Sequence, residues 1–196
     1  MYPDDDLQLA STISETNTVL RHSVINEFMS ELILTYRGTI YPWHCDHMGH
    51  MNVMWYTGKF DEASWQMLAR FGLTRSYLRE QNSLMAAVQQ DTTYKRELRA
   101  GDVVTIRTGI IEVREKVLRF LHEMRNDETG EIAAFTALTG VHMDMEMRRA
   151  HPFPTDFLDR VRQHVSDHGR VDPDNIHDTL PQGPYPTDPA ISGAVC

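Results

Sequence analysis

Residues 41–56, from Tyr41 to Tyr56, read YPWHCDHMGHMNVMWY, and this stretch is the most informative part of the sequence. One carboxylate, Asp46, lies in a polar, glycine-containing loop that runs directly into an amphipathic helix. The N–H groups in the first turn of a helix have no partners inside the helix and carry part of its dipole, so they can stabilise an oxyanion. The stretch therefore indicates that Asp46 and a few backbone amides could carry out an attack on a carbonyl group.

One long helix is expected after this loop. Asn52 is a suitable N-cap, and Gly72 is a suitable C-terminal stop. Between them, apolar side chains recur at spacings of three and four, which is the pattern of one buried helix face. The members of this stripe are Val53, Tyr56, Phe60, Ala63, Met67 and Phe71.

Five segments show the two-residue alternation of strands: 32–41, 84–94, 103–113, 117–125 and 131–147. In the first segment, one face carries Leu32, Leu34, Tyr36 and Ile40. In the last, Phe135, Ala137 and Val141 share a face, and Thr136 and His142 lie on the other. A strand, a long helix and then four antiparallel strands predict an α+β fold, with a curved sheet wrapped around the helix.

The composition limits the possible partners. The chain of 196 residues is 41% hydrophobic and carries a net charge of -9, which fits a soluble globular protein and argues against a nucleic-acid partner. No apolar run approaches the ~20 residues that span a bilayer, and the start, MYPDDDLQLA, lacks the pattern of a signal peptide. A cytoplasmic protein without membrane contact is therefore predicted. Cys45 and Cys196 do not indicate a disulfide framework.

Three regions are expected along the chain. Residues 1–30 form an N-terminal extension that is partly flexible, and residues 31–154 form the compact domain. Residues 155–196 form a helix that Thr155 caps and that runs to about Val165, followed by a flexible tail rich in proline and aspartate.

A family resemblance rests on the first stretch. An aspartate with a glycine three residues on, then His-Met-Asn and a tyrosine opening a long helix, resembles the active-site segment of hotdog-fold acyl-CoA thioesterases, the 4-hydroxybenzoyl-CoA thioesterase-like family. The similarity extends from about Leu32 to Pro154 and includes YKRELRAGD at residues 94–102 and, beyond it, Asp144 and Arg149. It implies the hotdog fold and hydrolysis of an acyl-CoA thioester to free acid and CoA without a metal or redox cofactor. Such a sheet has edge strands that can pair with those of another chain, so a homodimer or dimer of dimers is expected.

The resemblance also implies catalytic roles. Asp46 becomes the nucleophile or the general base, and the backbone amide of Val53 becomes the oxyanion donor. The alternative for Asp46 is a loop aspartate that only caps a turn. His50 and Asn52 are expected to hold the shape of the loop or to bind the substrate.

A second carboxylate position remains open. One branch of these thioesterases uses a helical carboxylate, so Asp61 or Glu62 could replace Asp46, although both lie off the apolar stripe of the helix.

Several further residues are expected to contact the substrate. Gly49 would let the loop approach it closely, or would simply form a turn. Tyr56 could line an acyl pocket or belong to the core. Gln89 and Asp91 would reach Asp46 from the partner subunit.

A basic cluster is expected to meet the CoA phosphates. It consists of Lys95, Arg96 and Arg99, just before the predicted turn at residues 100–102. A solvated strand end is the alternative for these side chains.

A zinc site is considered and set aside. His44, His47 and His50 flank Asp46, and imidazole and carboxylate both bind zinc. Histidines at steps of three would meet only on a helix, which Gly49 opposes, so no metal site is expected. Two other functions stay open: a module that binds acyl thioesters without turnover, and a hotdog hydratase or dehydratase.

Overall fold

Five strands form one antiparallel sheet in the order β1-β3-β4-β5-β2. The computed structural model describes residues 32–165. The strands are β1 Ile33–Thr39, β2 Ser83–Tyr94, β3 Val103–Val113, β4 Val117–Asn126 and β5 Ile132–Asp144. The expectations for residues 1–30 and for the tail beyond residue 165 lie outside the described residues.

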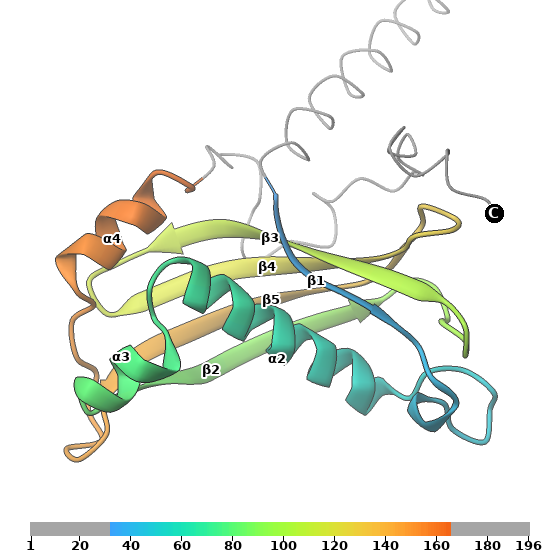
Figure 1. The fold of residues 1–196 in the computed structure, drawn as a ribbon, viewed down its shortest axis with the longest axis horizontal. Helices are drawn as coiled ribbons and strands as arrows, with labels where there is room; N and C mark the ends of the chain where they lie inside the picture. The colour runs from blue at the N-terminus through green and yellow to red at the C-terminus, as the bar shows by residue number, and fades with distance from the viewer. Residues whose placement is uncertain (1–31, 166–196) are drawn as a thin grey trace, which may run out of the picture. The chain divides into compact units, whose positions relative to one another are not determined.

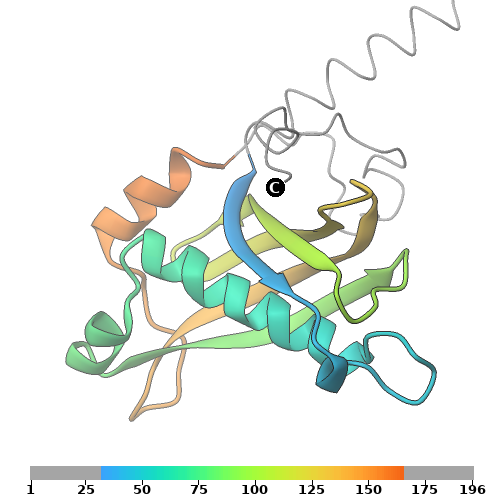
Figure 2. The same ribbon diagram turned by 45° about the vertical axis from the view of Figure 1, so that its right-hand side comes forward.

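One long helix, α2 Val53–Arg70, crosses a face of this sheet, as Figures 1 and 2 show. Two short helices, α3 Arg75–Glu80 and α4 Thr155–Arg162, lie towards the end of the sheet opposite the start of α2, and a single 3-10 turn, η1 Pro42–His44, follows β1. The predicted α+β hotdog layout of a sheet and one central helix is confirmed.

Both ends of α2 follow the sequence signals. Asn52 is the N-cap, and its side chain accepts a hydrogen bond from the N–H of Met54. At the other end Gly72 has φ +97, and the N–H of Leu73 donates to the carbonyl of Leu68 at 2.9 Å. This return of the chain through a left-handed glycine satisfies the last carbonyls of the helix and stops it.

The predicted apolar stripe of α2 is correct except at its start. The buried residues of the helix are Tyr56, Lys59, Phe60, Ala63, Ser64, Met67 and Leu68. Val53 is 57% exposed, so its assignment to the buried stripe was wrong. Its place as the first residue of the helix leaves it next to the loop instead of over the sheet.

The buried faces of the first and last predicted strands also need correction. In β1 the buried residues are Ile33 and Thr35, whereas Leu34 is 52% exposed, because a bulge between Leu34 and Tyr36 shifts the alternation. In β5 the buried set includes Thr136 and His142, which the sequence pattern treats as polar. Polar side chains thus lie in the core, where each needs a hydrogen-bond partner.

A chain of hydrogen bonds supplies partners across the core from α2 to β1. Ser64 Oγ lies 2.8 Å from Nε2 of His122 on β4, and Nδ1 of His122 lies 2.6 Å from Oγ1 of Thr108 on β3. Thr108 Oγ1 in turn lies 2.7 Å from Oγ1 of Thr35. All four side chains are buried, so this chain fixes where α2 lies on the sheet.

The last helix shares this core. Phe157, Leu158 and Val161 of α4 are buried in the same apolar cluster as Phe71 and Ile110. Thr155 is not the cap, because the helix already begins at that residue and Pro154 occupies the N-cap position. The predicted domain boundary at residue 154 stays a prediction.

Candidate active site

The loop before α2 is closed by its own backbone. Cys45 and Met51 form an antiparallel bridge, and the N–H of Asp46 donates to the carbonyl of His50 at 3.1 Å. The N–H of Gly49 donates to the carbonyl of Asp46 at 3.0 Å, and Gly49 has φ +84. Glycine is suited to this left-handed conformation, which lets the chain turn back at the tip.

The Asp46 carboxylate is held at both oxygens. Oδ1 accepts from the N–H of Met48 at 2.9 Å, and Oδ2 accepts from Nδ2 of Asn52, also at 2.9 Å. These two hydrogen bonds, first the Met48 amide and then the Asn52 side chain, lower the pKa of Asp46, and the nearby His50 and His47 add to this effect. The group is therefore ionised at neutral pH and oriented by its donors.

The residue that binds this carboxylate, Asn52, is also the N-cap of α2. Asn52 donates its N–H to the carbonyl of His44 at 2.9 Å and accepts the N–H of Trp55 at its own carbonyl, also at 2.9 Å. Within residues 32–165, the N–H of Val53 has no hydrogen-bond acceptor. This first helical amide is thus available to a ligand.

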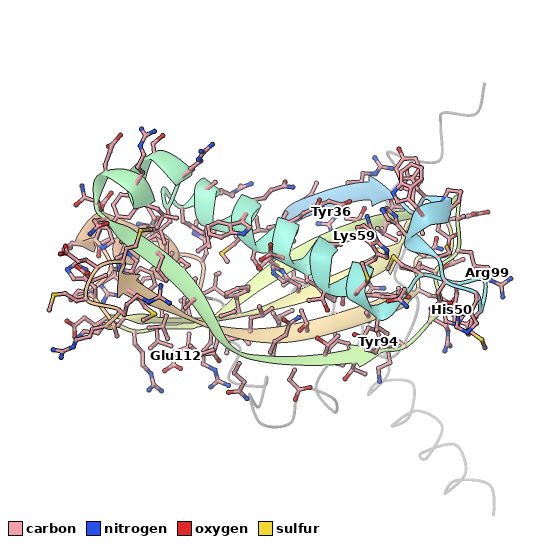
Figure 3. The ribbon with its side chains drawn as sticks, turned by 90° about the horizontal axis from the view of Figure 1, so that it is seen from below. Tyr36, His50, Lys59, Tyr94, Arg99 and Glu112 are labelled. Carbon is pink, nitrogen blue, oxygen red and sulfur yellow. The ribbon has the colours of Figure 1, made fainter. Side chains whose placement is uncertain are left out.

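His50 connects the loop to the segment that follows β2. The N–H of Met51 donates to the carbonyl of Leu98 at 2.7 Å. His50 Nε2 lies 3.8 Å from Oε1 of Glu97, whose Oε2 lies 3.7 Å from Arg99. Figure 3 shows His50 and Arg99 at the same end of the molecule, beyond the start of α2. The structure thus brings one member of the predicted basic cluster to the loop.

Arg96 and Tyr56 meet through the backbone. The hydroxyl of Tyr56 donates to the carbonyl of Arg96 at 3.2 Å, and the side chain of Arg96 pairs with Glu131 at 3.2 Å in an exposed position. Tyr56 is buried, and its ring meets that of Tyr94 edge-on at 5.1 Å. Burial raises the pKa of Tyr56 to about 12. Within this single chain, Tyr56 packs as a core residue that anchors the basic segment.

Gln89 and Asp91 lie elsewhere. Both are on the exposed part of β2, opposite Thr139 and Ala137 of β5. Neither residue is on the loop or on α2, so their contribution to the site from a partner subunit stays a prediction. Asp61 and Glu62 on α2 are exposed as well.

The bond from the Met48 amide is the turn-capping contact that the alternative for Asp46 expected. Sequence reasoning missed Lys59, which is buried and donates to the hydroxyl of Tyr36 at 2.9 Å. Figure 3 shows these two side chains next to each other. No sequence pattern marks a lysine as buried.

The loop histidines do not converge. His44 is buried, its Nδ1 accepts the N–H of Tyr41 at 3.0 Å, and burial followed by the charge of Lys59 lowers its pKa. His47 is exposed at the tip. In the described part of the chain, no group of three or more His, Cys, Asp or Glu side chains is arranged to hold a metal ion.

Among residues 32–165, the search for a helix with the length and hydropathy of a membrane span finds none.

The sequence of this chain is similar to those of known proteins. The model of the thioesterase-like superfamily matches residues 40–161. A curated relative, betainyl-CoA thioesterase of Pseudomonas aeruginosa, is 23% identical over 133 residues, which cover 68% of this chain and 84% of the relative.

Solved structures agree on the fold. A Staphylococcus aureus protein determined in complex with CoA has a TM-score of 0.65 at 19% identity, covering 84% of this chain and 94% of that one. A 1,4-dihydroxy-2-naphthoyl-CoA thioesterase from Synechocystis has a TM-score of 0.59 at 15% identity, covering 70% and 98%. The predicted fold and the predicted enzyme class, a thioesterase, are confirmed. The chain belongs to the thioesterase-like superfamily.

Proposed function

We propose that the protein hydrolyses an acyl-CoA thioester to the free acid and CoA, with Asp46 as the catalytic carboxylate and the Val53 amide as the oxyanion donor. The observation that carries this proposal is that Asn52 binds an ionised, doubly held carboxylate and stands next to a first helical amide that has no acceptor among residues 32–165. A thioester carbonyl bound at that amide would develop its negative charge where a donor is already in place.

Two routes use the same groups. As a nucleophile, Asp46 attacks the carbonyl carbon, the thiolate of CoA leaves, and water then hydrolyses the acyl anhydride. As a general base, Asp46 takes a proton from a water molecule that attacks the same carbon. Each oxygen of Asp46 accepts one hydrogen bond and so keeps a lone pair for either task.

The CoA moiety is proposed to bind over the segment after β2. Arg99 is exposed and pairs only weakly with Glu97 at 3.7 Å, and Arg96 is exposed beside Glu131. Guanidinium groups of this kind suit phosphate oxygens. The tie between Met51 and Leu98 would hold this segment against the loop that carries Asp46.

A homodimer, or a dimer of dimers, is proposed to complete the site in the cytoplasm. The edge strand β2 is 12 residues long, and its middle part is exposed, with Val88 at 60%. Among residues 32–165, β2 pairs on one side only, with β5, and a sheet edge of this length is a template for pairing with another strand. Pairing β2 with its copy would carry Gln89 and Asp91 towards the site of the other chain.

The test is thiol release from a panel of short, branched, long-chain, aromatic and cationic acyl-CoAs. The wild type is expected to hydrolyse at least one member, and Asp46→Asn is expected to lose turnover, because it keeps the shape and removes the charge. Asp61→Asn and Glu62→Gln are matched carboxylate variants on the exposed face of α2 and should keep activity. If Asp46→Asn keeps activity and one of these two variants loses it, the catalytic role would pass to the carboxylate changed in that variant. Binding of CoA esters without turnover in the wild type would favour the binding module.

A further inference from the structure

Asn52 lies between the two groups that the proposed reaction needs. Its backbone is extended, with φ -68 and ψ 144, and is bound to His44 on the loop side and to Trp55 on the helix side. The residue thus belongs to both elements at once. Its side chain has little freedom to choose another orientation.

Both ends of the Asn52 side chain are already used. Oδ1 accepts the N–H of Met54 at 3.1 Å, and Nδ2 donates to Oδ2 of Asp46 at 2.9 Å. The chemistry fixes which end is which, because an N–H needs an acceptor and a carboxylate needs a donor. A side chain committed in this way is poorly placed to bind substrate, which was one of the two roles expected for it.

No other common N-cap residue supplies both bonds. Serine accepts the helix N–H as well as asparagine does, but its hydroxyl is shorter and has one hydrogen in place of an amide group with two. Aspartate would also cap the helix, but it would set a second carboxylate against Asp46. Asparagine therefore does more at this position than start a helix.

We propose that Asn52 is a positioning residue, which orients the Asp46 carboxylate and fixes the adjoining Val53 amide through one side chain. The inference rests on the proposed function. It adds that the spacing between carboxylate and oxyanion donor is set by a residue that touches neither the thioester nor CoA. Misplacing reacting groups by about 1 Å costs on the order of 100-fold in rate, so the effect should be large in kcat and small in KM.

The variants Asn52→Ser and Asn52→Ala separate the two bonds. Asn52→Ser keeps the helix cap and loses the bond to Asp46, whereas Asn52→Ala loses both. We expect Asn52→Ser to unfold near the wild-type melting temperature and to lose kcat by roughly 10- to 100-fold at a similar KM. A purely structural role predicts instead that kcat falls only where the melting temperature falls, as in Asn52→Ala.

A second readout does not need activity. The titration of the Asp46 carboxyl, followed by NMR of its side-chain carbon, should move to higher pH in Asn52→Ser, because a hydrogen bond to the ionised form is lost. The other charged groups around the loop are unchanged in the variant: His47 and His50 on the loop, and Glu97 and Arg99 on the segment packed against it.

The outcomes distinguish this inference from the proposed function. If the wild type hydrolyses no thioester, the proposed function fails, and the titration of Asp46 still tests the contact with Asn52. If the wild type is active and Asn52→Ser keeps both its kcat and the wild-type titration of Asp46, the positioning role is overturned. Loss of kcat together with a shifted titration and an unchanged melting temperature supports it.

Discussion

The buried histidine of the core predicts how the protein responds to acid. His122 is fully buried, and burial lowers its pKa from 6.5 to about 3. Neutral imidazole has one donor and one acceptor nitrogen, and the two neighbouring hydroxyls can supply one acceptor and one donor to match. With a proton on Nε2, His122 donates to Ser64, and Ser64 donates to the carbonyl of Phe60 at 2.9 Å. Thr108 then donates to Nδ1.

The sign of the effect follows from the two pKa values. The unfolded chain binds a proton at this residue below about pH 6.5, whereas the folded chain binds one only near pH 3, so acid favours the unfolded state. Stability from His122 is therefore fully present above pH 6.5 and is lost as the pH falls. Between pH 7 and pH 5 the loss is about 2 kcal/mol, and by pH 4 it is about 3 kcal/mol.

The assay is urea unfolding at pH 7 and pH 5, comparing the wild type with His122→Leu. The change should not orphan the hydroxyls, because Ser64 keeps Phe60 and Thr108 keeps Thr35 as partners. The quantity compared is the drop in the free energy of unfolding between the two pH values. Other titrating groups contribute equally to both proteins and cancel. The variant should lose about 2 kcal/mol less than the wild type.

His122→Gln is a second variant in case leucine prevents folding. If the His122 variants lose as much stability between pH 7 and pH 5 as the wild type, the assignment of a neutral, proton-excluding His122 is refuted.

Three more changes test the region around α2. Lys59→Met removes a buried ammonium group that is bonded to the hydroxyl of Tyr36. In urea unfolding at pH 7, this change should raise the free energy of unfolding by about 1–2 kcal/mol. A free energy of unfolding below that of the wild type would contradict the view that burial of Lys59 is costly. Gly49→Ala places a side chain at φ +84, where no neighbouring atom interferes. The backbone strain alone should lower the stability measured by thermal unfolding by about 1 kcal/mol. A variant as stable as the wild type would argue against the left-handed turn. Tyr56→Phe leaves the carbonyl of Arg96 without its donor and should cost about 1 kcal/mol, with a fall in thiol release if that contact anchors the basic segment; an unchanged melting temperature would speak against the contact.

Local signals explain why so much of the fold was predictable. The cap at Asn52 and the stop at Gly72 are encoded within a few residues of each helix end, and α2 follows them. The third expected strand, residues 103–113, coincides with β3 because its ends are marked by turns. Features of this kind need no knowledge of distant parts of the chain.

Tertiary contacts explain the errors. The alternation sets Thr35 opposite the apolar face of residues 32–41 and His142 opposite that of residues 131–147, yet both are buried. Thr35 is matched by the hydroxyl of Thr108 on another strand, and Nδ1 of His142 lies 3.0 Å from the carbonyls of His151 and Pro152. Partners that lie on another strand or beyond the end of the strand cannot be inferred from the alternation of that strand alone.

The contrast between local signals and tertiary contacts also applies to the candidate site, and it explains which of the site's residues could be predicted from the sequence. Asp46, Asn52 and the Val53 amide are arranged by contacts within one short stretch, so their proximity follows from local turn and cap chemistry. The proposed CoA and acyl contacts come from β2 and the segment after it, whose approach depends on sheet register and, as proposed, on a second chain. A local loop can therefore keep the reaction chemistry while the edge strand and its partner vary the acyl group that fits. Exchanging residues 88–91 should accordingly change which acyl-CoA is preferred and leave the dependence on Asp46 intact.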